Sequence, residues 1–158
     1  MKKIFSLFVL LLLVLGLSGC NKQPNIEGSL SSIMKSLYSG VENKPTALKN
    51  YHIGKDEIER YIGTSDIKWK EAIASESQIM SIAHSVVLIR MSSDATTKDI
   101  QDAKNLIMEK ANPNKWICVG ADEKIVESNG NLIILIMTRS DIAPIIQENF
   151  LALGKEQN

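Results

Sequence analysis

Residues 83–91 are Ala-His-Ser-Val-Val-Leu-Ile-Arg-Met, and they are the starting point for predicting the fold. Apolar residues follow one another in its middle, so a strand built from them is apolar on both faces. A strand of this kind suits the interior of a sheet. We therefore predict an interior strand over residues 81–91.

Further strand segments are predicted on both sides of this one. They cover residues 69–75, then 116–119 with 123–128 as one strand bent at Gly120, and finally 132–138, which is apolar almost throughout. Asn129-Gly130 precedes the last strand and is a strong hairpin signal, because both turn positions need a positive φ. The last two strands are therefore expected to pair as a hairpin.

Four helices are predicted from apolar residues at helical spacing and from signals at their ends. Ser29 is a candidate N-cap of the first helix, and Gly63 closes a short second one. Thr96 and Asp99 resemble a capping box at the start of the third helix. Pro144 must lie in the first turn of the last helix, where its missing N–H costs little.

The order of these elements predicts an α+β fold. Two N-terminal helical elements, separated by a loop over residues 42–53, precede a strand-strand-helix unit that occurs twice. Hairpins joined by crossover helices predict a four-stranded, mostly antiparallel sheet with the helices mainly on one face. We assign residues 29–154 to one domain and residues 155–158 to a tail.

Residues 1–19 have the composition of a bacterial lipoprotein signal peptide. Lys2 and Lys3 precede an apolar run, and the run ends in Leu17-Ser18-Gly19-Cys20. This motif resembles the lipobox, in which an apolar residue and two small ones precede a cysteine that accepts a diacylglyceryl group. The alternative is an uncleaved transmembrane helix, which needs about 20 apolar residues, more than this run contains. We predict a lipid anchor on Cys20 and a location on the outer face of the cell membrane.

Residues 20–28 are predicted to form the lipidated cysteine and a polar linker. The eight residues after Cys20 include Pro24 and Gly28, which are typical of linkers. Fully extended, they reach about 26 Å at roughly 3.3 Å per residue. The domain is therefore expected close to the membrane.

Composition limits the partners of the domain. The chain has 18 basic and 18 acidic residues, and loss of Lys2 and Lys3 with the signal peptide leaves a net charge of −2. This balance gives no reason to expect nucleic acid as a partner. Apart from Cys20 the only cysteine is Cys118, so no intramolecular disulfide is possible and the core alone must stabilise the fold.

Four residues are candidates for a binding site: His84, Arg90, Trp116 and Cys118. Cys118 has apolar neighbours, and a small buried hydrophobe on a strand is favoured over a nucleophile or redox thiol. His84 shares a strand face with Arg90, and a neutral structural hydrogen bond is favoured over catalysis. For Trp116, beside Lys115, a core-capping role is favoured over ligand stacking.

No metal site and no cofactor is predicted. His52 and His84 are 32 positions apart and have no clustered carboxylate or thiolate beside them in the sequence. The burial of the four candidate residues therefore decides between two interpretations. If they line one cleft they form the site, and if all are interior a catalytic use loses its support.

Four sequence segments carry a resemblance to a known family. They are Tyr-Ile-Gly-Thr-Ser-Asp-Ile at 61–67, Ile-Ala-His-Ser-Val-Val-Leu-Ile at 82–89, Asn-Lys-Trp-Ile-Cys-Val-Gly at 114–120 and Leu-Ile-Ile-Leu-Ile-Met at 132–137. The chain resembles small lipoproteins of low-GC Gram-positive bacteria that are classified as a domain of unknown function. The resemblance implies a compartment, the outer face of the cytoplasmic membrane, and a domain that is complete as it stands. It implies no activity.

Three functions stay open at the level of sequence. The favoured hypothesis is a noncatalytic, membrane-anchored module that binds another envelope protein or a small ligand. The second is an enzyme that acts on wall or lipid precursors through His84, with Cys118 or a nearby serine. The third is a structural scaffold that pairs through a sheet edge.

Overall fold

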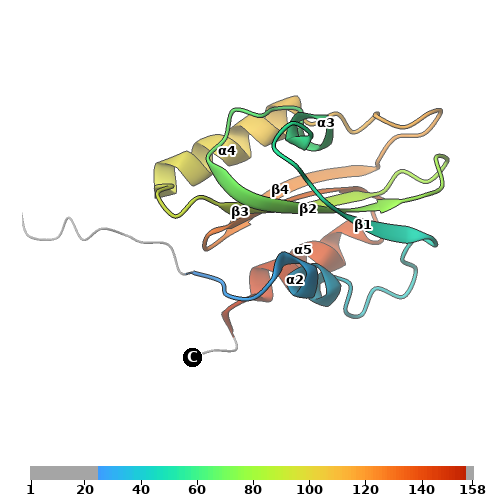
Figure 1. The fold of residues 1–158 in the computed structure, drawn as a ribbon. Coiled ribbons are helices and arrows are strands. Elements are labelled where there is room, and N and C mark those ends of the chain that lie inside the picture. Colours follow the sequence, from blue (N-terminus) through green and yellow to red (C-terminus); the bar gives the residue numbers. More distant parts are fainter. Residues whose placement is uncertain (1–24, 156–158) are drawn as a thin grey trace, which may run out of the picture.

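A computed structural model describes residues 25–155, in which five strands form one antiparallel sheet (Figure 1). The strands are β1 (Leu48–His52), β2 (Trp69–Ser77), β3 (Ser85–Met91), β4 (Glu123–Asn129) and β5 (Leu132–Thr138). Their order across the sheet is β1-β2-β3-β5-β4. The predicted interior position of β3 is confirmed, and β5 is interior as well.

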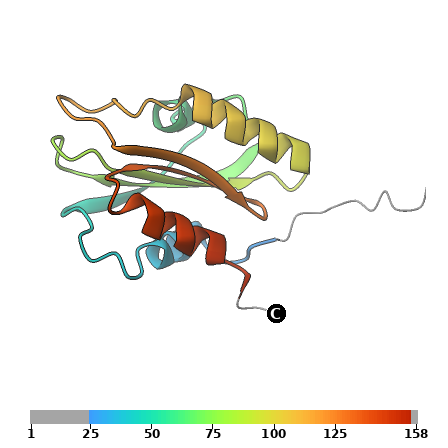
Figure 2. The same ribbon diagram turned by 180° about the vertical axis from the view of Figure 1, so that it is seen from behind.

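Four helices cover the two faces of this sheet. They are α2 (Leu30–Leu37), α3 (Ile58–Ile62), α4 (Thr97–Lys110) and α5 (Ala143–Ala152). Figures 1 and 2 show α3 and α4 on one face and α2 and α5 on the other. The α+β class and the repeated strand-strand-helix order are confirmed, but the prediction that the helices lie mainly on one face is wrong.

Two cores, one on each face, explain why both faces are covered. All seven residues of β3 and all seven of β5 are buried, and alternate side chains point to opposite faces. Val87, Ile89 and Leu135 join the core under α3 and α4, which we call the α4-side core. Val86, Leu88 and Ile134 join the core under α2 and α5, the α2-side core. A strand that is apolar on both faces needs a helix layer on each of them.

The sheet has five strands because residues 48–52, predicted as part of a loop, form the edge strand β1. Its sequence, Leu-Lys-Asn-Tyr-His, has no apolar stripe, and three of its five residues are exposed. Pairing with β2, from Leu48 opposite Ser77 to His52 opposite Ile73, makes it a strand. An edge strand needs little apolar patterning, so the sequence signal for it is weak.

The predicted strand at 116–119 is absent from the structure, and this segment belongs to the loop between α4 and β4. Cys118 has a φ of 62°, a left-handed backbone conformation that interrupts an extended chain. The loop folds back on itself, since the Ala121 N–H donates to the Pro113 carbonyl at 2.9 Å. The strand after it begins at Glu123, as predicted.

Local signals place the helix ends. The Ser29 side chain caps α2 by accepting from the Ser32 N–H, and Thr96 and Asp99 form a complete capping box on α4. Gly63 ends α3 with a φ of 79°, and a Cβ there would lie 2.2 Å from the Lys110 carbonyl oxygen. Pro144 lies in the first turn of α5. All four predictions are confirmed.

The β4–β5 hairpin is also confirmed, with a different turn. Asn129 pairs with Leu132, so the turn residues are Gly130 and Asn131. Only Gly130 of this pair has a positive φ, at 56°. Glycine at the first turn position is typical of a type II′ turn.

The signal peptide, the lipobox with Cys20 and the linker up to Pro24 lie outside the described residues, as does the end of the tail from 156 to 158. Among residues 25–155, no helix is long and apolar enough to span a membrane.

Candidate functional site

His84 lies directly before β3, and its side chain is completely buried. Nε2 lies 2.7 Å from the hydroxyl of Tyr38, which follows α2. Nδ1 lies 2.7 Å from Oγ1 of Thr138, the last residue of β5. The imidazole therefore joins α2, β3 and β5 through two hydroxyl groups.

Burial keeps this histidine neutral. It lowers the pKa of His84 to about 4, because a charged imidazolium would lose its hydration inside the protein. Burial also raises the pKa of Tyr38, against a hydrogen bond from Ser75 that acts in the opposite direction. A neutral imidazole donates through one nitrogen and accepts through the other, which satisfies both hydroxyl contacts. No face of the ring is left for a substrate, so this geometry argues against His84 as a catalytic base.

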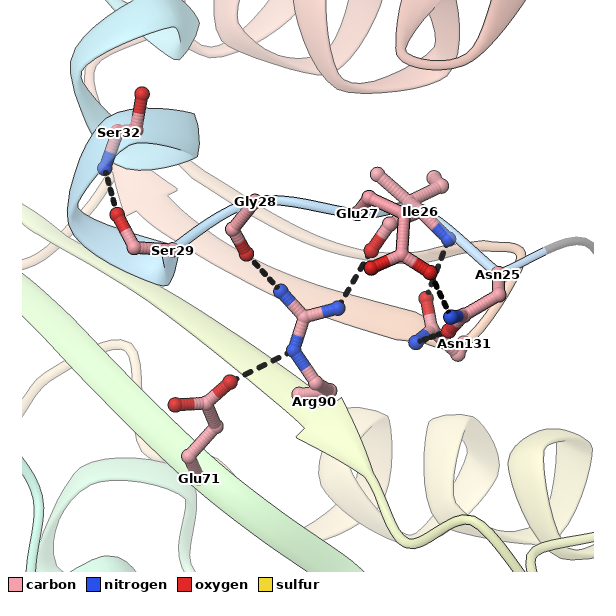
Figure 3. A network of polar contacts seen from close by, with 9 residues as sticks. All are labelled: Asn25, Ile26, Glu27, Gly28, Ser29, Ser32, Glu71, Arg90 and Asn131. Atoms are coloured by element: carbon pink, nitrogen blue, oxygen red, sulfur yellow. Dashed lines mark hydrogen bonds and ion pairs between the residues drawn. The ribbon is translucent and has the colours of Figure 1, made fainter.

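Arg90 occupies the other end of β3 and is 8 % exposed. Its guanidinium group makes three hydrogen bonds (Figure 3). Nε donates to Glu71 Oε1 at 2.7 Å, Nη1 to the Ile26 carbonyl at 2.5 Å and Nη2 to the Gly28 carbonyl at 2.6 Å. All three guanidinium nitrogens of Arg90 thus donate hydrogen bonds to other residues of the same chain.

Cys118 is exposed, so the favoured interpretation of it as a small buried hydrophobe on a strand is wrong. The sequence shows apolar neighbours, but Ile117 beside it is itself 68 % exposed, because the loop turns both residues outward. Trp116 is partly buried and packs on the α4-side core, which agrees with the capping role. Lys115 Nζ lies 5.2 Å from the Trp116 ring centre and forms an ion pair with Glu76.

The four candidate residues do not form one site. His84 and Arg90 are six residues apart along an extended chain, which separates them by about 20 Å at roughly 3.3 Å per residue. They belong to the α2 face of the sheet, whereas Trp116 packs on the α4 face. Cys118 is exposed on a loop. The four residues are neither gathered in one cleft nor all interior.

A groove that the sequence analysis did not identify lies beside α2. Its volume is about 1250 Å³. The residues that line it come from α2 and the two residues after it, the loop before β1, and the first two strands: Ser31, Ser32, Met34, Lys35, Ser36, Tyr38, Ser39, Glu42, Lys44, Pro45, Thr46, Ala47, Leu48, Asn50 and Ser75. The serines on the outer side of α2 were the one sequence signal for it.

Most of the residues that line this groove, which we call the α2 groove, carry a polar group, but apolar atoms make up more of its surface than polar atoms do. Its polar groups include five serine hydroxyls, one threonine, one asparagine and the hydroxyl of Tyr38, which can donate and accept hydrogen bonds. Lys35 and Lys44 add positive charge, and Glu42 adds negative charge. Two of the lining residues, Tyr38 and Ser75, connect the groove to the buried His84. The hydrogen bond between Tyr38 and His84 therefore holds one wall of the groove in place.

The edge of the sheet runs alongside the α2 groove. The Ile53 N–H donates to the Ala72 carbonyl, and the Gln78 N–H donates to the Ala47 carbonyl. In residues 47–53, the backbone N–H and C=O groups of the odd-numbered residues therefore point toward β2. Because the bonding direction alternates in an antiparallel ladder, the backbone groups of Leu48, Asn50 and His52 point away from β2. Among the described residues, no other strand pairs with β1 on that side.

A second hollow, of about 500 Å³, lies between residues 65–68 and α4. Three of its charged groups, those of Lys68, Asp99 and Asp102, form ion pairs. Lys68 Nζ is 3.1 Å from Asp99 Oδ1, and Asp99 also caps α4. Within residues 25–155, no group of three or more histidine, cysteine, aspartate or glutamate side chains is placed to hold a metal ion.

Comparisons with protein-family models, curated proteins and solved structures found no match to this chain. The resemblance to the lipoprotein family stays a prediction.

Proposed function

We propose that this protein is an extracytoplasmic, lipid-anchored and noncatalytic module that binds an envelope protein or a small ligand in the α2 groove. The observation that carries the proposal is the groove itself, which combines an apolar surface with many hydrogen-bonding side chains and lies beside a sheet edge. Concave surfaces that combine apolar lining with placed hydrogen-bond groups are typical of binding sites. The anchor rests on the sequence Leu17-Ser18-Gly19-Cys20.

The burial of His84 supports the noncatalytic part of the proposal. The enzyme hypothesis needs an accessible imidazole within reach of a nucleophile. His84 has both ring nitrogens in hydrogen bonds with Tyr38 and Thr138 and is buried, whereas Cys118 is exposed on a loop. We therefore do not propose an enzyme that uses His84.

Binding in the groove is tested by filling it. Ser31→Trp places a large ring in the groove, whereas Gln101→Trp places the same ring on the exposed side of α4. Wild-type protein is expected to recover a partner from solubilised membranes, or to gain melting temperature with a ligand fraction. Ser31→Trp should lose that effect and Gln101→Trp should keep it.

The proposal for the groove fails if no partner or ligand effect is found, or if both tryptophan variants behave alike. Circular dichroism and urea unfolding of the two variants establish that each is folded before the comparison is made.

The anchor is tested with the two cysteines. Cys20→Ser should abolish incorporation of labelled fatty acid and move the protein out of the membrane fraction, because stable anchoring needs two acyl chains. Cys118→Ser is the matched control and should leave both properties unchanged. Fatty-acid incorporation that survives in Cys20→Ser would contradict the proposed anchor.

A second candidate function, a scaffold that pairs through a sheet edge, is favoured by the outward backbone groups of Leu48, Asn50 and His52. Asn50→Pro removes one outward N–H and leaves the bonds between β1 and β2 intact, since proline is tolerated on the open side of an edge strand. If the partner adds a strand, Asn50→Pro should abolish binding and Asn50→Ala should not. Equal binding by both variants would exclude strand addition at β1.

A further inference from the structure

The segment before α2 is fastened to the domain. Arg90 holds the Ile26 and Gly28 carbonyls, and Asn131 at the β4–β5 turn accepts from the Ile26 N–H at 3.0 Å (Figure 3). Asn131 also donates to the side chain of Asn25. The Ile26 side chain packs in the α2-side core. Within residues 25–155, contacts with the domain are therefore already made at Asn25, four residues before the domain boundary predicted at residue 29.

This fastening halves the number of residues between Cys20 and the first residue that is held by the domain. We call these intervening residues the tether. Between Cys20 and Asn25 there are four residues, which span at most about 14 Å at roughly 3.3 to 3.6 Å each. If residues 25–28 were free, eight residues would span about 26 to 29 Å. A folded domain of about 130 residues has a radius of gyration of roughly 14 Å, so its diameter exceeds the shorter tether about 2.5-fold.

The attachment point lies at one end of the sheet. Arg90 is near the end of β3, Glu71 is near the start of β2, and Gly130 and Asn131 form the turn between β4 and β5. We call this the Arg90 end. The loops 78–84 and 112–122 lie at the opposite end, because they precede the first residues of β3 and β4 (Figure 1). The strands β3, β4 and β5 have seven residues each, so they separate the two ends by about 23 Å at roughly 3.3 Å per residue.

The hydrogen bonds from Arg90 to the carbonyls of Ile26 and Gly28 are here called the Arg90 clamp. We infer that this clamp determines which surface of the domain faces the bilayer. The Arg90 end, with residues 92–96 and the Gly130-Asn131 turn, lies against the lipid headgroups, and the loops 78–84 and 112–122 point away from them. The occupant of this surface is the membrane that holds the anchor. This inference rests on the proposed lipid anchor at Cys20.

The free thiol allows a direct test of the orientation. Lipidated full-length protein is placed in vesicles of phosphatidylcholine and phosphatidylglycerol that contain a nitroxide-headgroup quencher. A fluorophore is attached to Cys118 at the far end, or to Asp94→Cys in a Cys118→Ser background at the Arg90 end; both positions are exposed. We expect several-fold stronger quenching at position 94 than at position 118.

Arg90→Met tests the clamp itself. Release of residues 25–28 doubles the tether, so the difference in quenching between the two positions should shrink. Arg90→Lys is a second variant for the case that Arg90→Met does not fold, because a single ammonium group cannot make the three forked contacts of a guanidinium group. A folded variant with an unchanged difference would overturn the role of Arg90.

Flotation of the vesicles separates the two proposals. Protein that floats with the vesicles and is quenched equally at positions 94 and 118 overturns the orientation but leaves the anchor intact. Protein whose Cys20 carries no lipid and that does not float overturns the anchor and the orientation together. Flotation with strong quenching only at position 94 supports both.

Discussion

The two ends of β3 each bury a polar side chain on the same face of the sheet, and they use it differently. His84 is neutral and bonds to two hydroxyl groups, from Tyr38 and Thr138. Arg90 is charged and bonds to two backbone carbonyls of the N-terminal segment and to one carboxylate. The neutral group joins elements of the core, whereas the charged group fastens a segment that has no secondary structure of its own. The type of partner decides what each residue does.

The largest expected effect comes from Arg90→Met. The variant keeps most of the apolar stem but removes three charge-assisted hydrogen bonds, each worth roughly 1.5 kcal/mol or more. The free energy of unfolding should fall by about 4 kcal/mol in urea titrations at neutral pH. Lys70→Met, an exposed position on β2, is the control and should change it by less than about 0.5 kcal/mol. A loss of stability as small as that of the control would contradict the claim that Arg90 fastens the N-terminal segment to the domain.

The next effect concerns pH. The pKa of His84 is about 4 in the folded protein and about 6.5 when the chain is unfolded. The unfolded state therefore binds more protons between these values, and stability falls as the pH drops from about 6.5 to 4. The total loss from this group is roughly 3 kcal/mol.

Urea titrations at pH 7, 6, 5 and 4.5 measure how the free energy of unfolding changes with pH. Stability above pH 7 should be insensitive to His84. His84→Gln removes the titrating group and should flatten the slope in this window, while Arg90→Lys should leave it unchanged. A wild-type protein with no loss between pH 6.5 and 4.5 would contradict a buried neutral imidazole.

Tyr38→Phe and Thr138→Val each remove one hydroxyl and leave one ring nitrogen of His84 without its partner. A buried polar group without a partner costs about 1 to 3 kcal/mol, so each variant should lose about 1.5 kcal/mol. Tyr51→Phe is the control, since Tyr51 is on β1 and its hydroxyl bonds to the exposed Gln78. Nitrogen-15 NMR of the imidazole should report a changed tautomer balance only in the first two variants. Equal losses of stability in all three variants would contradict the claim that the two hydroxyl groups stabilise the fold through their hydrogen bonds to His84.

The smallest effect is expected from Glu71→Gln. The Glu71 side chain is 48 % exposed, so water and salt screen its charge from Arg90. The loss should be about 0.5 kcal/mol and should disappear in about 1 M salt. A loss as large as that of Arg90→Met would mean that the carboxylate, and not the carbonyls, holds the guanidinium group.

Local patterns predicted much of the fold. The bounds of β5, the cap of α2 at Ser29, the capping box at Thr96 and the position of Pro144 were all predicted correctly, because each depends on residues within a few positions of one another. The strand β1 was missed because an edge strand is half exposed and needs no apolar stripe. The predicted strand around Cys118 was wrong because one residue with a positive φ is not marked by its type.

The α2 groove was missed for a different reason. Its walls come from α2, from the loop that precedes β1, and from the strands β1 and β2. These elements are brought together only when β1 pairs with β2. The serines of α2 indicated a polar outer face, but a polar face is ordinary for a helix on a protein surface. Only the neighbouring elements turn that face into the wall of a groove.

The class of the fold and the interior position of β3 follow from the amino-acid sequence alone, because hydrophobic periodicity and capping act over short distances along the chain. The sequence also carries the motif from which the anchor at Cys20 is proposed. Only the tertiary structure decided what His84 and Arg90 do. Glu71 is 19 residues from Arg90, and the other partners of these two residues are 46 to 64 residues away along the chain. A buried polar side chain takes its role from whichever group the fold brings within hydrogen-bond distance.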